Sequence, residues 1–142
     1  MKKIIIVLGS NHEQEKNVGF AMNQLSQNFP GVRFSRLLWT EPIGMENSPQ
    51  FVNALAIAFT DLPEPTVVSV LKDIERQCGR TKEEKSQGIV KLDLDLLLYG
   101  DLRRKEEDWE RDYVKQLLGE MGEWFPTVRL HSLAVFYKRK SR

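Results

Sequence analysis

Segments with the apolar pattern of β-strands alternate along this chain with segments of helical spacing, and this order constrains the fold most. Strand patterns cover residues 3–8, 32–39, 51–59, 91–99 and 128–137. Helical patterns cover residues 17–29, 63–79 and 111–121. Prolines at the start of the second helix and Cys78-Gly79 at its end are typical helix boundaries. The polar stretches 41–49 and 80–91 are expected to be loops.

The first six of these elements follow the order βαββαβ. This order is typical of a ferredoxin-like α+β sandwich, in which helices pack on an antiparallel sheet. The chain has 142 residues, of which 41% are hydrophobic, so it can bury one substantial core. No linker-like stretch divides it, and we expect a single domain over residues 1–142.

Composition excludes several classes of protein. The apolar runs are too short to cross a bilayer, and the run that ends at Leu8 continues into Gly9-Ser10-Asn11 rather than a signal-cleavage pattern. The only cysteine, Cys78, has no partner for an internal disulfide. The formal net charge is +1, which gives no general reason to bind nucleic acid. We therefore expect a cytoplasmic protein without a membrane or nucleic-acid partner, and its oligomeric state stays open.

Two carboxylates interrupt the apolar strand over residues 91–99. Asp93 and Asp95 are two residues apart, so both point to one face of a strand, while Leu92 and Leu94 point to the other. Such a pair suits Mg²⁺, which proteins usually bind through one or two carboxylates together with substrate phosphates. A half-exposed edge strand with a polar face has the same pattern, and the segment alone leaves both interpretations open.

Five short motifs follow one another between residues 4 and 100. They are Leu8-Gly9-Ser10-Asn11, Trp39-Thr40-Glu41-Pro42-Ile43-Gly44, Phe51-Val52-Asn53-Ala54, Ile74-Glu75-Arg76-Gln77-Cys78-Gly79-Arg80, and Leu92-Asp93-Leu94-Asp95 with Tyr99-Gly100. Each motif alone is weak, but their order and spacing resemble the 6-hydroxymethyl-7,8-dihydropterin pyrophosphokinase family. The resemblance implies a ferredoxin-like fold and transfer of pyrophosphate from ATP to a pterin hydroxymethyl group. It also implies two Mg²⁺ ions bridged by the paired aspartates.

The resemblance implies a pterin site that this chain retains. Phe51 and Tyr113 correspond to the two rings that enclose the flat pterin, the second through a match of Arg111-Asp112-Tyr113-Val114. Asn53 corresponds to the amide that reads the polar edge of the pterin. The loop that supplies further contacts to the pterin corresponds to Thr40, Pro42 and Ile43. Stacking on aromatic faces and pairing with buried amides suit a planar heterocycle.

The nucleotide site that the resemblance implies is altered. Val90 stands where the family has a phosphate-binding arginine, Gln87 replaces a tryptophan, and no Pro-His pair lies between Gly100 and Arg111. The residues that the resemblance assigns to the nucleotide and its phosphates are Glu75, Arg80, Lys82 and Arg111. The cluster Arg103-Arg104-Lys105, which stands in the segment without the Pro-His pair, could supply substitute phosphate contacts. That cluster is equally compatible with solvated charge beside the acidic residues 106–108.

Three interpretations of function follow. The first is a divergent pyrophosphokinase that uses the remaining cations as substitute phosphate contacts, with Arg80, Asp93, Asp95 and Arg111 as its catalytic residues. The second is a related protein that binds a pterin or a similar heterocycle without turnover. The third is a transferase of the same fold with another substrate. Loss of phosphate contacts should lower the rate of such a transfer more than it disturbs the fold.

Overall fold

A computed structural model describes residues 1–42, 49–79 and 81–123. Its elements in chain order are β1 (Lys2–Ser10), α1 (Gln14–Asn28), β2 (Arg33–Phe34), β3 (Leu38–Thr40), β4 (Phe51–Thr60), α2 (Glu64–Gln77), α3 (Lys82–Ser86), β5 (Asp93–Tyr99), β6 (Leu102–Arg103), α4 (Glu106–Trp109) and α5 (Asp112–Glu120). The sequence-based order of strands and helices is confirmed up to β5, except that the second expected strand is divided into β2 and β3 and that the short helix α3 precedes β5. The strand expected over residues 128–137 lies outside the described residues.

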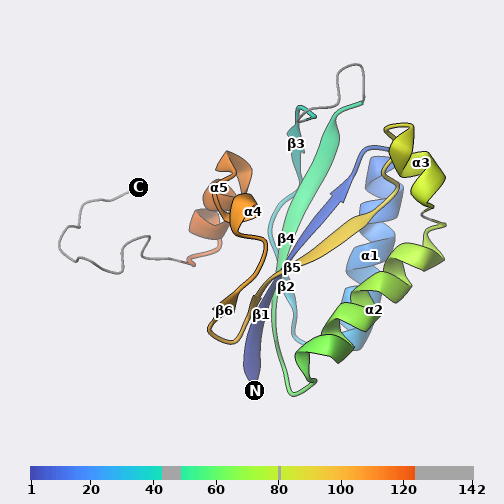
Figure 1. Cartoon of the computed structure of the whole chain (residues 1–142). Coiled ribbons are helices and arrows are strands. Elements are labelled where there is room, and N and C mark those ends of the chain that lie inside the picture. Colours follow the sequence, from blue (N-terminus) through green and yellow to red (C-terminus); the bar gives the residue numbers. More distant parts are fainter. Residues whose placement is uncertain (43–48, 80, 124–142) are drawn as a thin grey trace.

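The strands form one antiparallel sheet with β1 at its centre. The strand order is β2-β4-β1-β5-β6, and β3 pairs with the same edge of β4 as β2 does. β1 pairs along its whole length with β4 and over most of it with β5. This arrangement confirms the predicted α+β fold with helices packed on an antiparallel sheet (Figure 1).

Helices cover both faces of the sheet, and each face has its own apolar core (Figure 1). The long helices α1 and α2 pack side by side on one face, over Ile4, Ile6 and Leu8 of β1. The short helices α4 and α5 pack on the other face, over Ile5 and Val7. The alternating side chains of β1 therefore divide between two cores, as the pleat of a strand requires.

The single strand expected over residues 32–39 is divided into β2 and β3. Ser35 lies at the break and is buried, and its backbone amide donates to the carbonyl oxygen of Leu55 at 2.9 Å. The Leu55 amide donates in turn to the Ser35 hydroxyl oxygen at 2.8 Å, so a side chain replaces a backbone carbonyl in the ladder. The regular pairing ends there and resumes at Leu38.

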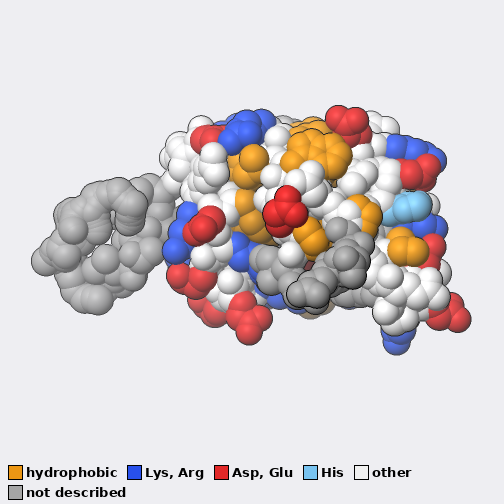
Figure 2. Space-filling model, turned by 90° about the horizontal axis from the view of Figure 1, so that it is seen from above, with side chains coloured by type: hydrophobic (Ala, Val, Ile, Leu, Met, Phe, Trp, Pro, Cys, Tyr) orange, Lys and Arg blue, Asp and Glu red, His pale blue; other side chains and the backbone are white. Residues whose placement is uncertain are grey.

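Two short helices were not predicted from the sequence. α3 lies within the polar stretch 80–91, and α4 precedes the helix expected over residues 111–121, which is confirmed as α5. No helix in the described part of the chain is long and apolar enough to span a bilayer. Seen from above, apolar side chains are exposed across the middle of the described surface with an acidic side chain among them, and most other charged side chains lie toward its edges (Figure 2).

Candidate active site

One end of the sheet carries a line of functional residues across three strands. Gly9 of β1 is paired with Asn53 of β4 on one side and with Asp93 of β5 on the other. Two residues earlier on β1, Val7 is paired with Asp95. Because side chains of directly paired residues lie on the same face, these side chains all point toward α4 and α5. Residues up to 88 positions apart in sequence, Val7 and Asp95, are thereby brought together.

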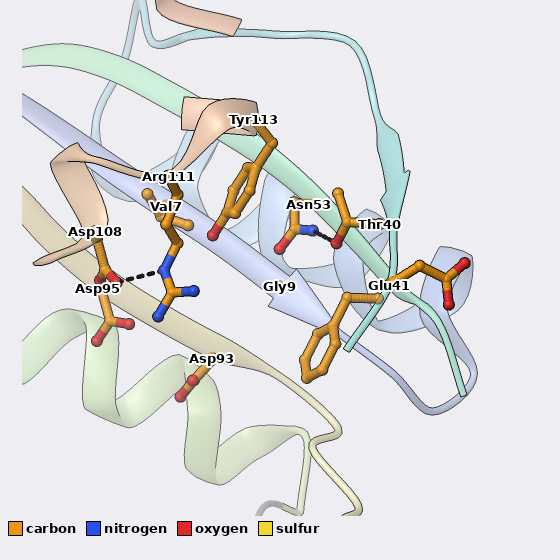
Figure 3. Close-up of a pocket in the computed structure, with 11 residues that line it drawn as sticks. Val7, Gly9, Thr40, Glu41, Asn53, Asp93, Asp95, Asp108, Arg111 and Tyr113 are labelled. Atoms are coloured by element: carbon orange, nitrogen blue, oxygen red, sulfur yellow. Dashed lines mark hydrogen bonds and ion pairs between the residues drawn. The ribbon is translucent and has the colours of Figure 1, made fainter. Parts of the chain in front are cut away.

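A cavity of about 190 Å³ lies over this line of residues. Its lining comes from β1, β3, β4, β5, α4, α5 and the residues beside them: Val7, Gly9, Thr40, Glu41, Phe51, Asn53, Asp93, Asp95, Asp108, Arg111 and Tyr113. Figure 3 shows the two aspartates of β5 at one side of the cavity and Asn53 with Thr40 at the other, with Arg111 and Tyr113 reaching in from α5. Seven of the predicted site residues thus meet at one place.

Asn53 is held in a fixed orientation at the bottom of the cavity. Its side chain is 4% exposed, and its Nδ2 donates to the Thr40 hydroxyl oxygen at 2.6 Å. A Cβ atom on Gly9 would lie 3.1 Å from Asn53 Oδ1 and 3.8 Å from Cδ1 of the Phe51 ring. The absence of a side chain at Gly9 therefore leaves room for the amide and the ring on the neighbouring strand.

An irregularity in β5 brings α4 and α5 over the cavity. The register between β1 and β5 shifts at Leu97, and both Leu97 and Leu98 belong to the core beneath α4 and α5. The Leu97 carbonyl oxygen accepts from the Arg104 amide at 2.8 Å and from Trp109 Nε1 at 3.2 Å. Trp109 is 4% exposed, so a buried indole attaches α4 to the strand that carries the aspartates. Bulges of this kind often lie beside functional sites.

Asp108 is a site residue that the sequence analysis placed only in a run of acidic residues. Arg111 Nε donates to Asp108 Oδ1 at 2.9 Å, and this hydrogen bond raises the pKa of the Arg111 guanidinium. Burial raises the pKa of the Tyr113 phenol to about 12, and the charge of Asp108 adds to this effect. Tyr113 is therefore neutral at physiological pH. The spacing of three residues between Asp108 and Arg111 was the available signal, because such pairs meet on one side of a helical turn.

Asp93 and Asp95 lie on the same face of β5, as predicted, and line the cavity, whereas Leu92 and Leu94 are buried in the core on the other face of the sheet. Lys105 Nζ lies 3.7 Å from Asp95 Oδ1. Within residues 1–42, 49–79 and 81–123, no group of three or more potential ligand side chains could hold a metal ion. Two carboxylates one pleat apart instead fit an ion such as Mg²⁺, which completes its coordination with water and substrate phosphates.

Glu75 has a different environment from the cavity residues. Glu75 as a whole is 4% exposed, and its Oε2 accepts from the Leu94 amide at 2.7 Å. Lys82 is exposed at the start of α3, and neither it nor Glu75 is among the residues that line the cavity. Pro42 is half-buried and also lies outside the lining. Ile43 and Arg80 lie outside the described residues.

Val90 is a buried position in this fold. Its side chain is 3% exposed, and its amide donates to Asn11 Oδ1 at 2.7 Å. Asn11 Nδ2 donates to the Gly88 carbonyl oxygen at 2.7 Å, so Asn11 binds the segment before β5 with both ends of its amide. In the basic cluster 103–105, Lys105 lies close to the carboxylate of Asp95.

The fold and this site define a class of α+β protein in which a cavity lined by Phe51 and Tyr113 adjoins a pair of carboxylates. The family model described as 7,8-dihydro-6-hydroxymethylpterin-pyrophosphokinase matches residues 5–127. The chain belongs to this family.

Named relatives agree with this assignment. A 2-amino-4-hydroxy-6-hydroxymethyldihydropteridine pyrophosphokinase of Porphyromonas gingivalis is 30% identical over 139 residues, which cover 87% of this chain and 93% of that protein. The Haemophilus influenzae protein of the same name is 37% identical over 100 residues, covering 68% of this chain and 61% of that protein. A mitochondrial folate synthesis bifunctional protein of Arabidopsis thaliana is 33% identical over 147 residues, covering 94% of this chain. The match spans only about a quarter of the two Arabidopsis proteins, 26% and 25% of their lengths.

Proposed function

We propose that this chain transfers pyrophosphate from ATP to 6-hydroxymethyl-7,8-dihydropterin in folate synthesis. The hydroxymethyl oxygen attacks the β-phosphorus of ATP, and the bond from that phosphorus to the oxygen bridging it to the α-phosphate breaks. The products are the pterin pyrophosphate ester and AMP, and the hydroxyl proton passes to solvent. The observation that supports the proposal is the line of paired residues Asn53, Gly9 and Asp93 across three strands, because it places a buried amide beside one of two neighbouring carboxylates.

The pterin half of the proposed site consists of rigid parts. Phe51 and Tyr113 line the same cavity as Asn53 and offer aromatic faces to a flat ring system. The Thr40 hydroxyl oxygen accepts one hydrogen bond from the Asn53 side-chain amide. This bond fixes the direction of Oδ1 and of the second N–H of that amide. A heterocycle that leaves a buried amide unpaired would lose about 1 to 3 kcal/mol, and this penalty supplies selectivity. Pro42 and Ile43 remain predicted loop contacts.

The phosphate half of the proposed site depends on charge placement. Asp93 and Asp95 would hold Mg²⁺, and we expect two ions when ATP is present. Bound there, the ions would neutralise phosphate charge and align the two substrates. Arg111 is held by Asp108 at the cavity, where its remaining donors can face developing charge on the phosphates. Arg80, Lys82 and Glu75 remain predicted contacts of the nucleotide.

The cytoplasmic location also remains a prediction, as does the absence of a nucleic-acid partner.

Substitution of Asp95 tests the proposal. We expect Asp95→Asn to abolish AMP formation from ATP and the pterin, because the metal pair loses one charged ligand. Pterin affinity, measured by isothermal titration, should change less than about twofold, a difference well under the 1.4 kcal/mol of a tenfold change. Binding of a non-hydrolysable MgATP analogue should be lost in the same instrument.

The matched control is Asp101→Asn, which removes an exposed aspartate from the turn after β5 and should leave both affinities and the rate unchanged. Parental transfer rates in Asp95→Asn would refute the metal role of this residue. A parent protein that binds the pterin but forms no AMP would support the binding protein without turnover instead.

A further inference from the structure

The three basic residues between β5 and α4 have different partners. Arg104 Nε and Nη2 donate to the two carboxylate oxygens of Glu64 at 2.7 and 2.9 Å. The Arg103 guanidinium lies 4.4 Å from the centroid of the Trp109 ring. Lys105 is directed instead toward Asp95, with 3.7 Å between Nζ and Oδ1. Lys105 is therefore placed beside a carboxylate that lines the cavity.

The backbone of Lys105 adopts a conformation that favours glycine. Its φ of 55° and ψ of 57° are left-handed, and its carbonyl oxygen accepts from the Asp108 amide at 2.8 Å as α4 begins. A residue with a Cβ atom adopts this conformation at a cost of about 1 kcal/mol or more relative to glycine. Strained residues of this kind concentrate at functional sites. A lysine kept at such a position, with its ammonium at Asp95, points to a function for the side chain.

We propose that Lys105 is a phosphate-binding residue of the pyrophosphate transfer; this inference rests on the proposed function. In the absence of nucleotide its ammonium balances the charge of Asp95. When the carboxylate pair holds a divalent ion, the ammonium is repelled from Asp95 and attracted to phosphate oxygens. The side chain is 57% exposed and has a flexible stem, so it can turn without disturbing the core. Lys105 thereby supplies positive charge in place of the arginine that the family has at the position of the buried Val90.

The conformation of Lys105 provides a sharp experiment. Lys105→Gly removes the ammonium and relieves the backbone strain at once, so the melting temperature should stay equal or rise. We expect kcat/KM for ATP and affinity for the non-hydrolysable MgATP analogue to fall by about tenfold to a hundredfold, the usual range for a hydrogen bond to a charged group. Pterin affinity should not change. Lys105→Arg should restore most of the loss.

Glu13→Gly is the matched control, because Glu13 also precedes a helix with positive φ, 44°, and its carboxylate pairs with Lys16 on the surface. This variant should gain stability in the same way and keep parental ATP kinetics. Unchanged analogue affinity and kcat/KM in Lys105→Gly would overturn the inference. Equal losses of pterin and nucleotide affinity would also overturn it, because they indicate a structural role. A parent that forms no AMP would refute the proposed function and, with it, a role of Lys105 in the transfer; loss of analogue affinity in Lys105→Gly would then show phosphate binding alone.

Discussion

At the scale of single residues, the missing side chain of Gly9 on β1 leaves the space that the Asn53 and Phe51 side chains of β4 occupy. A methyl group at this position would approach Asn53 Oδ1 to 3.1 Å, which is tighter than ordinary contact, and the Phe51 ring to 3.8 Å. We expect Gly9→Ala to shift the amide and to weaken pterin binding by about tenfold, equivalent to 1.4 kcal/mol. The melting temperature should fall by only a few degrees, since a single destabilisation of about 1 kcal/mol has that effect. Isothermal titration and thermal unfolding measure the two quantities.

Gly19→Ala provides the control for this prediction. Gly19 is exposed on α1, and a Cβ atom there would meet no heavy atom within 4 Å. Alanine should stabilise that helix by about 0.5 to 1 kcal/mol and leave pterin affinity unchanged. Parental pterin affinity in Gly9→Ala would show that the space beside Asn53 is not used by the ligand.

At the scale of elements, Glu75 connects α2 to the strand that carries the aspartates. Among the described strands, β6 pairs with the outer edge of β5 only at Leu98 and Tyr99, and Glu75 accepts the Leu94 amide further along that edge. We expect Glu75→Ala to lower the free energy of unfolding by about 1 to 3 kcal/mol, because a buried amide loses its acceptor. Glu75→Gln keeps an acceptor oxygen and should lose less. Urea unfolding measures both variants.

The same pair of variants tests the predicted nucleotide contact. If Glu75 binds the nucleotide directly, Glu75→Gln should raise KM for ATP while the unfolding free energy stays parental. If the main role of Glu75 is to anchor β5, Glu75→Ala should lower the free energy of unfolding. Its ATP kinetics should then change only indirectly, through displacement of Asp93 and Asp95. A free energy of unfolding in Glu75→Ala equal to that of the parent would contradict the anchoring role of Glu75.

Some features of these elements could be predicted from sequence patterns, and others could not. The two-residue spacing of Asp93 and Asp95 was enough to predict their common face, because strand geometry fixes it locally. The break between β2 and β3 was not predictable, since the apolar pattern continues through it and the cause is a hydrogen bond from Leu55, 20 positions away. The position of α4 likewise depends on the carbonyl of Leu97. Resemblance to a family supplied the predicted pterin contacts, whereas the place of Asp108 at the cavity became visible only in the folded structure.

At the scale of the whole molecule, the two cores have different relations to the site. The core under α1 and α2 stabilises the face of the sheet away from the cavity, whereas the core under α4 and α5 supports the helices that carry Asp108, Arg111 and Tyr113. Binding of a pterin between β4 and α5 should therefore depend on the second core. The first core should affect stability alone.

Two leucine substitutions separate these contributions. Leu25 on α1 and Leu117 on α5 are both fully buried, one in each core, and each Leu→Ala change should cost about 2 to 5 kcal/mol of unfolding free energy. Both variants should remain folded at low temperature, where a domain of this size has about 5 to 15 kcal/mol of stability. We expect Leu117→Ala to weaken pterin binding by about tenfold, because the cavity left beneath α5 lets Tyr113 and Arg111 shift, and we expect Leu25→Ala to keep the parental affinity. Titration calorimetry on samples whose folding is verified by circular dichroism decides the matter: equal affinities in the two variants would show that α5 is not held in place by its core.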